Sequence, residues 1–239
     1  VNIYYISSFE PSDKNDFKET LENCYKKFDE NNYPIIIIND NNNGGYVSFS
    51  QLFLGIISPL MPIKLYNGRI RITDSFTETE GINGYITSNL TSVDDCLKCS
   101  FEQLINGKIE VDYENDITSE LTEVFHLNNK SIYNDIEDIR TTMKNKRKPT
   151  EILVYTDGYS FSAASLYLKY LKHNGGAIIT QYLGNPQKED EKFDISQSPT
   201  PVFISSIISL FSNENYKQLS KEYECELQLP GIQSFYNSE

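Results

Sequence analysis

The clearest pattern along the chain is a strand, a turn, a helix and a second strand in its C-terminal half. Ile152 to Tyr155 are apolar or aromatic and predict a buried strand, and Thr156-Asp157-Gly158 is a turn signal. Apolar residues then recur with helical spacing from Ala163, and Asn174-Gly175-Gly176 is typical of a helix end. Residues 177–180 predict the next strand. Such a unit predicts two parallel strands joined by a right-handed crossover.

The N-terminal part of the chain repeats this alternation of strand and helix. Residues 1–8 alternate in polarity, and Ser12 or Asp13 can cap a helix over residues 14–29. The apolar face of this helix would be formed by Phe17, Leu21, Cys24, Tyr25 and Phe28. Residues 34–38 are the most apolar β-branched run of the chain, as expected of a central parallel strand covered on both faces. A second helix is predicted over residues 47–57.

The middle of the chain has a weaker pattern. Residues 73–148 are polar and rich in Asn, Asp, Glu and Thr, with helices predicted near residues 93–104 and 132–145. We interpret this region as an insertion or cap over the sheet of one domain that spans residues 1–239. The basic run 144–148 is interpreted as a solvated helix end. A last strand is predicted near residues 225–229.

Composition excludes several classes of function. The net charge of −13 and the pI near 4.7 argue against a nucleic-acid partner, which would favour a basic stripe. No apolar run approaches the roughly 18 residues that a membrane span requires. The hydrophobic content of 38% is enough for a core without a cofactor, and we expect neither a cofactor nor a metal. The acidic residues are scattered and indicate a solvated surface rather than a cationic partner.

The cysteines and glycosylation sequons bear on the compartment. Cys96-Leu-Lys-Cys99 has the spacing of a metal knuckle, but no second pair and no nearby His complete a zinc site. A local disulfide or two free thiols are therefore expected. The sequons at Asn89 and Asn129 favour an extracellular or secretory-lumen setting. The chain begins at Val1 with neither an initiator Met nor a signal peptide, as a mature chain or a piece of a longer protein would.

Ser162 is a candidate nucleophile. It lies at the predicted start of a helix, where backbone N–H groups and the helix dipole favour developing negative charge. Ala163 and Ala164 are small and leave room for a substrate carbonyl. A serine in this position can also be a simple helix cap. The spacing alone leaves both roles open.

The loop at residues 39–45 is a second candidate element of a site. It follows the most apolar strand, and in open α/β sheets ligands bind at the carboxyl ends of the strands. Gly44 and Gly45 would let backbone N–H groups approach a substrate, as an oxyanion hole requires. The alternative is an Asn-rich flexible loop. The loop has neither a P-loop nor a G-x-G-x-x-G pattern, so nucleotide binding is not expected.

In order and spacing, these motifs resemble those of the tail-specific, or C-terminal-processing, serine peptidases. The resemblance is carried by Asn42-Asn-Gly-Gly45, Ser160-Phe-Ser-Ala163 and Gly184-Asn-Pro186, each after a predicted strand. Tyr5-Ile-Ser-Ser-Phe9 and Asp157-Gly-Tyr159 make it most similar to the branch of the chlamydial protease-like activity factor. It implies an α/β fold with a ClpP/crotonase-like ββα core and a mainly parallel sheet.

The resemblance also implies roles for particular residues. Ser162 falls on the nucleophile of the family, and the N–H of Ala163 with one from Gly44 or Gly45 would form the oxyanion hole. The substrate would be a peptide or protein. The resemblance covers residues 1–186 and is weak over the polar middle region.

The general base is where the sequence departs from the family. The family lysine would fall at Gln187, beside Lys188, whereas the chlamydial branch uses an upstream histidine assisted by a late glutamate. Of the two histidines, His173 would lie about 16 Å along the helix from Ser162, and His126 falls in the polar region. We therefore expect an upstream segment or a partner chain to supply the histidine. The candidates for the late acid are Glu222, Glu224 and Glu226.

Two other functions fit parts of the sequence. A catalytically inactive relative would keep the sheet and the cleft and bind peptides or proteins, as the missing base suggests. An α/β-hydrolase elbow would make Ser160 the nucleophile, but that motif requires a glycine two residues later and a downstream histidine. The serine peptidase is the function that the motifs favour.

Overall fold

The computed structural model describes part of the chain, which falls into two compact units. The described residues are 1–62, 67–68, 90–92, 109–113, 117–121, 125–127, 130–182, 202–204, 221 and 228–230. The first unit is built from Val1–Lys64 and Asn129–Ser198, and the second from Leu65–Asn128 and Pro199–Glu239. Helix α6 (Lys130–Thr142), which lies within the predicted insertion, belongs to the first unit. The single domain spanning the whole chain stays a prediction.

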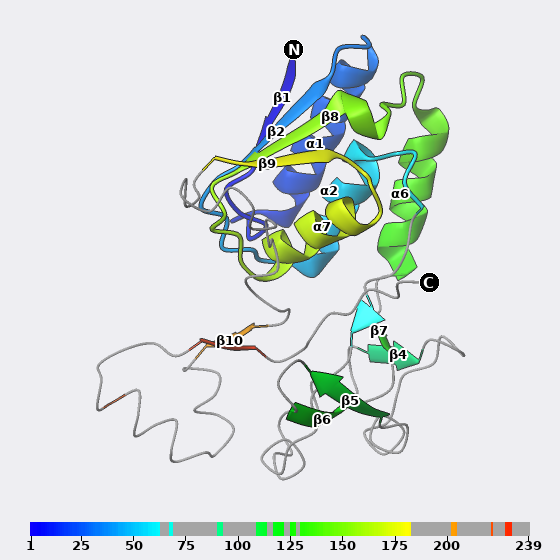
Figure 1. Cartoon of the computed structure of the whole chain (residues 1–239). Helices are drawn as coiled ribbons and strands as arrows, with labels where there is room; N and C mark the ends of the chain where they lie inside the picture. The colour runs from blue at the N-terminus through cyan, green and yellow to red at the C-terminus, as the bar shows by residue number, and fades with distance from the viewer. Residues whose placement is uncertain are drawn as a thin grey trace. The chain divides into compact units, whose positions relative to one another are not determined.

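The first unit contains a four-stranded sheet in which all neighbouring strands are parallel (Figure 1). Its order is β1-β2-β8-β9, with bounds Asn2–Tyr5, Ile35–Asn39, Ile152–Thr156 and Ile178–Gln181. The apolar run of β2 lies in the interior of the sheet, as predicted. Helix α7 (Ser162–His173) connects β8 to β9, which confirms the predicted parallel crossover. The fold is therefore mixed α/β with a parallel sheet.

The helices begin and end where the sequence signals are strongest. Helix α1 (Lys14–Asp29) is capped by the Asp13 side chain, which accepts hydrogen bonds from two N–H groups of the first turn. Helix α2 (Val47–Ile57) has the bounds predicted from its apolar run. Helix α7 ends before Gly175, which has a φ of +60°, and the Gly176 N–H closes the last turn at 2.8 Å from Leu171 O. The predicted helix end is thus confirmed.

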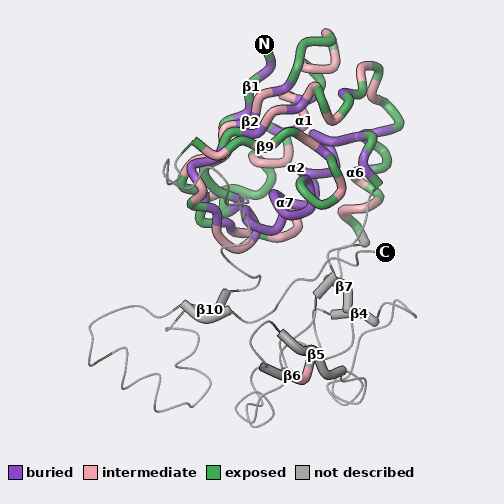
Figure 2. Tube along the Cα trace, viewed as in Figure 1, coloured by how far each residue is buried: buried purple, intermediate pink, exposed green. Residues whose placement is uncertain are grey.

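One face of the sheet forms the core. Alternate residues of β2 and β8 are buried on this face, and the described helices α1, α2 and α7 lie on that side of the sheet (Figures 1 and 2). An aromatic cluster fills the layer between sheet and helices. Phe9 packs on Phe53 and Tyr167 with ring centroids 6.0 and 5.4 Å apart, and Tyr4 meets Phe53 edge-on at 5.3 Å. These four rings are buried.

The other face of the sheet is apolar but much less covered, which corrects the prediction that β2 is buried on both faces. Strand pairing places two rows on this face: Ile3, Ile36, Leu153 and Ile178, followed by Tyr5, Ile38, Tyr155 and Thr180. Ile3 is 52% exposed and Tyr5 64% exposed, while Ile36 and Ile38 are half-buried. The sequence of β2 predicts burial on both faces because residues 35–38 are all isoleucine. In the structure, however, the described helices cover only one face of the sheet.

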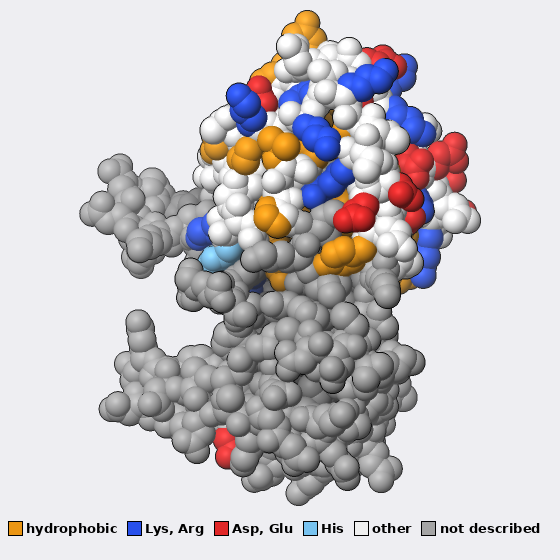
Figure 3. Space-filling model, turned by 90° about the vertical axis from the view of Figure 1, so that its right-hand side faces the viewer, with side chains coloured by type: hydrophobic (Ala, Val, Ile, Leu, Met, Phe, Trp, Pro, Cys, Tyr) orange, Lys and Arg blue, Asp and Glu red, His pale blue; other side chains and the backbone are white. Residues whose placement is uncertain are grey.

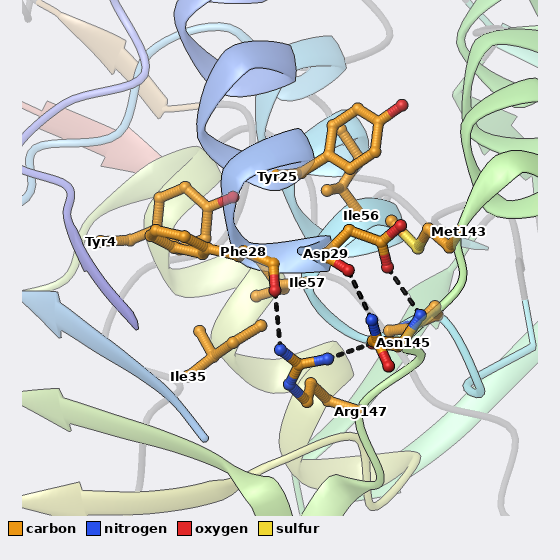
Figure 4. A pocket seen from close by; sticks show the side chains of 11 residues that line it. Tyr4, Tyr25, Phe28, Asp29, Ile35, Ile56, Ile57, Met143, Asn145 and Arg147 are labelled. Carbon is orange, nitrogen blue, oxygen red and sulfur yellow. Dashed lines mark hydrogen bonds between the residues drawn. The ribbon is translucent and has the colours of Figure 1, made fainter. Parts of the chain in front are cut away.

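Arg147 corrects the prediction that residues 144–148 form a solvated helix end. The residue is 4% exposed, and its guanidinium donates at 2.8 Å to Phe28 O, near the C-terminus of α1 (Figure 4). It also donates to Tyr33 O at 2.8 Å. Asp29 is bonded to the backbone of Lys144 and Asn145. A positive charge at these carbonyls stabilises the helix end, because unsatisfied C=O groups gather there. Arg147 therefore anchors the chain, whereas the three lysines of the run are exposed, as predicted.

A small cavity lies beside this anchor, at the amino end of the sheet. Figure 4 shows Tyr4, Tyr25, Ile35, Met143 and Arg147 among the side chains that line it. Its volume of about 20 Å³ has room for about one water molecule. A cavity of this size is not a substrate site.

Arg140 makes a second anchor, between α6 and the end of α2. Its Nε donates to Gly55 O at 2.8 Å, Nη1 to Met61 O at 2.8 Å and Nη2 to Ser58 O at 2.9 Å. The side chain is 9% exposed. Burial lowers the pKa of Arg140 to about 10, which still leaves the guanidinium charged at neutral pH. Gly55 lets the helices approach, because a Cβ there would lie 2.6 Å from Ile136 Cγ2.

The second unit is described through its strands. Its sheet has the order β3-β7-β4 with antiparallel pairing, and β5 pairs with β6, and β10 with β11, also in antiparallel fashion. The bounds are Asn67–Gly68 (β3), Leu90–Ser92 (β4), Ile109–Tyr113 (β5), Ile117–Leu121 (β6), Phe125–Leu127 (β7), Val202–Ile204 (β10) and Gln228–Pro230 (β11). Strand β11 overlaps the last strand predicted. The helix predicted near residues 93–104 lies outside the described residues.

Charged side chains of both signs are interspersed on the face of the first unit seen in Figure 3. This distribution is that of a solvated surface, as expected from the scattered acidic residues. Among the helices that the structure describes, none combines the length and apolar character needed to cross a bilayer.

Candidate active site

Ser162 occupies a strained position between β8 and α7. It is the first residue of the helix, and its φ of +48° lies in the left-handed region that residues with a side chain rarely adopt. Such a backbone costs about 1–3 kcal/mol and persists only where the surroundings impose it. The residue is half-buried.

The turn before Ser162 is held by its own side chains. Asp157, which is buried, accepts from the Asn41 N–H at 2.8 Å and from the Tyr159 N–H at 2.9 Å. The Gly158 N–H donates to Thr156 Oγ1 at 3.2 Å, and its φ of +86° suits glycine. The contact with Asn41 ties the turn to the loop after β2. The Asp-Gly-Tyr motif thus connects the turn before Ser162 to the loop after β2 by hydrogen bonds.

The loop at residues 39–45 continues the parallel sheet past the ends of its strands. Asn42 pairs with Ser160: its N–H donates to Tyr159 O at 3.1 Å, and its C=O accepts from the Phe161 N–H at 2.9 Å. On the other side Phe9 pairs with Gly45 through hydrogen bonds to the residues that flank this glycine. The loop therefore lies between the Phe9 segment and the serine turn.

Gly44 lies directly against the serine. A Cβ atom at this position would lie 2.6 Å from Phe161 O, 2.8 Å from Ser162 Cβ and 2.9 Å from Ala163 N. Its φ of +88° also excludes most other residues. The structure thus brings Gly44 against Ser162 and Ala163, while Gly45, the next residue of the loop, packs against Phe9 and Glu10.

The backbone donors around Ser162 differ in their hydrogen bonds. The Gly44 N–H donates to Asn42 Oδ1 at 2.9 Å. Within the part of the chain that the structure describes, the N–H groups of Gly45 and Ala163 have no acceptor. Ala163 is fully buried, and a buried N–H without a partner is costly unless a ligand supplies an acceptor.

Ser160 belongs to a buried polar network under the two loops. Its Oγ accepts from Asn39 Nδ2 at 2.8 Å and lies 3.3 Å from Thr156 Oγ1. Asn39 in turn accepts from Asn42 Nδ2 at 3.0 Å. All four side chains are at most 4% exposed. Ser160 thus joins β2 to β8, which does not favour the α/β-hydrolase elbow.

Sequence reasoning missed the side chains of Asn39 and Asn42. They were interpreted as part of an Asn-rich loop, because loops with several asparagines are usually exposed turns. A sequence signal did exist: Asn39 directly continues the strict apolar run of β2, so its position predicts a buried side chain. A buried asparagine requires partners, and these partners form the network.

Within the described part of the first unit, the one histidine lies far from Ser162. His173 is the last residue of α7, exposed, and eleven residues along the helix from Ser162. His126 lies in β7 of the second unit. The remaining candidates lie outside the described residues: Gln187, Lys188, Glu222, Glu224 and Glu226. No group of acidic, His and Cys side chains able to hold a metal occurs in the described part of the chain.

Tyr182 and Asp40 form a polar pair at the same edge of the sheet. The Tyr182 N–H donates to Thr156 O at 3.1 Å, which places the residue beside the end of β8. A hydrogen bond to Asp40, with smaller contributions from burial and from the charges of Asp40 and Asp157, raises the pKa of Tyr182 to about 12. Sequence reasoning gave no signal for this pair, because the partners lie far apart in the chain.

Asp40→Asn is expected to lower the pKa of Tyr182 toward its ordinary value of 10, because the substitution removes the carboxylate acceptor. A raised pKa in the folded state gives stability that is present below pH 10 and is lost as the pH rises toward 12. The measurement is a pH titration of tyrosinate absorbance, with Tyr182→Phe identifying the signal. An unchanged Tyr182 titration in the Asp40 variant would show that the pair is not formed.

Comparison with known proteins returns solved structures only; no family model and no curated protein matches the chain. Mature CPAF, the chlamydial protease-like activity factor, complexed with lactacystin is similar at 19% identity, over 74% of this chain and 36% of that chain, with a TM-score of 0.41. A mutant of CPAF is similar at 18% identity, over 98% of this chain and 42% of that chain, with a TM-score of 0.46.

A lipoprotein from Streptococcus agalactiae is also similar, at 14% identity over 74% of this chain and 44% of that chain, with a TM-score of 0.35. The chain therefore spans 36–44% of the length of these three solved proteins. The chlamydial branch that the sequence motifs resemble is represented among the matches. At these identities and TM-scores, the function of the chain has to be argued from its own site.

Proposed function

We propose that this chain is the nucleophile-bearing part of a serine-type peptidase with a ClpP/crotonase-like ββα core. The observation that carries the proposal is the backbone at Ser162, which has a φ of +48° at a strand-to-helix turn. In α/β-hydrolases the nucleophilic serine lies on a similarly strained strand-to-helix turn, which exposes Oγ beside backbone N–H groups. Strain of this size without a function would be a net loss of stability.

The surroundings of Ser162 suit acyl transfer. In the proposed reaction Ser162 Oγ attacks the carbonyl carbon of a peptide bond and loses its proton to a general base. The carbonyl oxygen becomes an oxyanion, and the Ala163 N–H with an N–H of the glycine loop stabilises it. Collapse of the tetrahedral intermediate releases the amine, and water then hydrolyses the acyl-enzyme. The unpaired N–H of Ala163 and the close approach of Gly44 support this assignment.

The general base is proposed to come from outside the described residues. A histidine on an upstream segment or on a partner chain would take the proton of Ser162, with Glu222 or Glu226 as the late acid. The exposed position of His173, far along α7, supports a source other than this residue. The alternative function is a catalytically inactive module that binds peptides or proteins at the same site, and the position of His173 is the observation in its favour.

The test is labelling with a fluorophosphonate probe, which forms a covalent adduct with an activated serine. The chain and the longest native form of the protein are compared, and the adduct is mapped by mass spectrometry. We expect labelling of the longer form at Ser162, and its loss in Ser162→Ala. If the longer form is folded but not labelled, the proposed peptidase function is wrong, and the binding module remains as the alternative function. An adduct on Ser160 would instead restore the α/β-hydrolase elbow.

A further inference from the structure

We propose that Asn42 is a positioning residue which makes Gly45, and not Gly44, the glycine-loop donor to the oxyanion. The inference rests on the proposed function, because an oxyanion forms only if Ser162 attacks a carbonyl. The sequence alone allows either Gly44 or Gly45 to be this donor. The Asn42 carboxamide is held by buried partners and occupies the N–H of one of these glycines.

The orientation of the Asn42 carboxamide follows from its partners. Ile6 O lies 3.2 Å from Nδ2 and can only accept, whereas the Gly44 N–H lies 2.9 Å from Oδ1 and can only donate. The carboxamide therefore cannot be flipped without breaking both hydrogen bonds. Nδ2 donates in addition to Asn39 Oδ1 at 3.0 Å. Asn42 is fully buried, so water does not compete for these partners.

The backbone of Asn42 is fixed to the serine turn at the same time. Its N–H and C=O are paired with Tyr159 and Phe161 at 3.1 and 2.9 Å. Asn39, which accepts from the Asn42 carboxamide, donates in turn to Ser160 Oγ at 2.8 Å. One residue therefore contacts both halves of the site: the turn through its backbone and the glycine loop through its side chain.

The two glycines therefore differ in whether their N–H group is available to an oxyanion. The N–H of Gly44 is buried and occupied by Asn42 Oδ1, so it cannot stabilise an oxyanion without breaking a hydrogen bond. In the pairing with Phe9, the Gly44 C=O accepts from the Phe9 N–H and the Tyr46 N–H donates to Phe9 O. The Gly45 N–H takes no part in this pairing. Of the two glycines, Gly45 is thus the one whose N–H has no acceptor among the described residues, and at the helix start the same holds for Ala163.

The first experiment is hydrogen exchange of the two glycine amides, followed by NMR. In the unmodified protein we expect slow exchange at Gly44 and fast exchange at Gly45, because only Gly44 N–H is bonded. On phosphonate modification, the Gly45 amide should become protected and shift, since the phosphonyl oxygen occupies the oxyanion position. Equal exchange of the two amides in the unmodified protein would overturn the inference, whatever the labelling shows.

The second experiment compares Asn42→Ala with a matched control, Asn2→Ala. Asn2 is also a buried asparagine, bonded to Asn31 Oδ1 at 2.9 Å and to Tyr33 O at 3.1 Å, but it lies at the amino end of β1. Both substitutions remove side-chain hydrogen bonds of a buried amide and should destabilise the fold. Only Asn42→Ala should slow phosphonate labelling, by about 10²-fold, because without the carboxamide the glycine loop can shift and misplace the Gly45 N–H.

The two failures can be told apart. If the unsubstituted longer form is not labelled, the proposed peptidase function is wrong, and the glycine exchange pattern still decides the role of Asn42. If labelling occurs and falls equally in both asparagine variants, Asn42 is merely structural. Should Asn42→Ala not fold, the exchange and the phosphonate-induced shift at Gly45 in the unsubstituted protein decide the outcome.

Discussion

Gly44→Ala is expected to slow the phosphonate labelling of Ser162 by about 10²-fold or more, because misplacing the reacting groups by an ångström has an effect of that size. The new methyl group would lie 2.6 Å from Phe161 O and 2.9 Å from Ala163 N, and both are backbone atoms that side-chain rotation cannot move away. The loop and the serine turn would have to separate. The Ala163 N–H would move with the turn, so the nucleophile and a proposed oxyanion donor would both be displaced.

The same substitution should lower the free energy of unfolding by about 3 kcal/mol or more, from the left-handed backbone and the overpacked contact together. Gly175→Ala is the matched control, because Gly175 also has a positive φ, +60°, but has no atom within 4 Å of an added Cβ. It should cost roughly 1–2 kcal/mol and leave labelling unchanged. Urea denaturation and labelling rates measure both effects. Equal behaviour of the two variants would mean that Gly44 does not contact the serine turn.

Arg140→Met is expected to destabilise the first unit by about 3 kcal/mol or more, because it leaves three buried carbonyl groups without a donor. These are Gly55 O, Ser58 O and Met61 O, each within 2.9 Å of a guanidinium nitrogen. Methionine fills much of the volume of the aliphatic stem, so the loss reports the hydrogen bonds more than the packing. Hydrogen exchange of the α2 amides, combined with urea denaturation, measures the effect within the first unit.

Lys18→Met serves as the control for this prediction. Lys18 pairs with Asp135 of α6 at 2.7 Å, but the two side chains are 41% and 35% exposed. Water screens such a pair, and its loss should cost less than about 1 kcal/mol. If Arg140→Met were as mild as Lys18→Met, the guanidinium would not be the anchor of α6 in solution.

Local signals predicted much of the first unit. Helix α1 begins after Asp13 because a carboxylate cap satisfies its first N–H groups, and α7 ends at Gly175 because glycine tolerates the left-handed turn. The apolar run of β2 gave its place inside the sheet. Each of these features depends on residues close together in the chain, and for that reason the sequence reveals them.

The features that were missed depend on partners far apart in the chain. In the sequence, Arg147 is one of several charged residues in a basic run. Its burial depends on hydrogen bonds to the carbonyl groups of Phe28 and Tyr33, which are distant in the chain. Gly44 and Gly45 look equivalent until the Asn42 side chain occupies one of their N–H groups. The positive φ of Ser162 is likewise imposed by the loop packed against it, since no residue type at this position demands it.

The two arginine anchors also determine how force would pass through the chain. Arg140 and Arg147 lie between the start of α6 and the start of β8, and each holds carbonyl groups at the end of a different helix. A pull on the chain before Lys130 would load these contacts first. The strand that carries the Ser162 turn lies behind them and would be shielded from the load. The strained serine can thus keep its geometry when the chain before Lys130 is pulled.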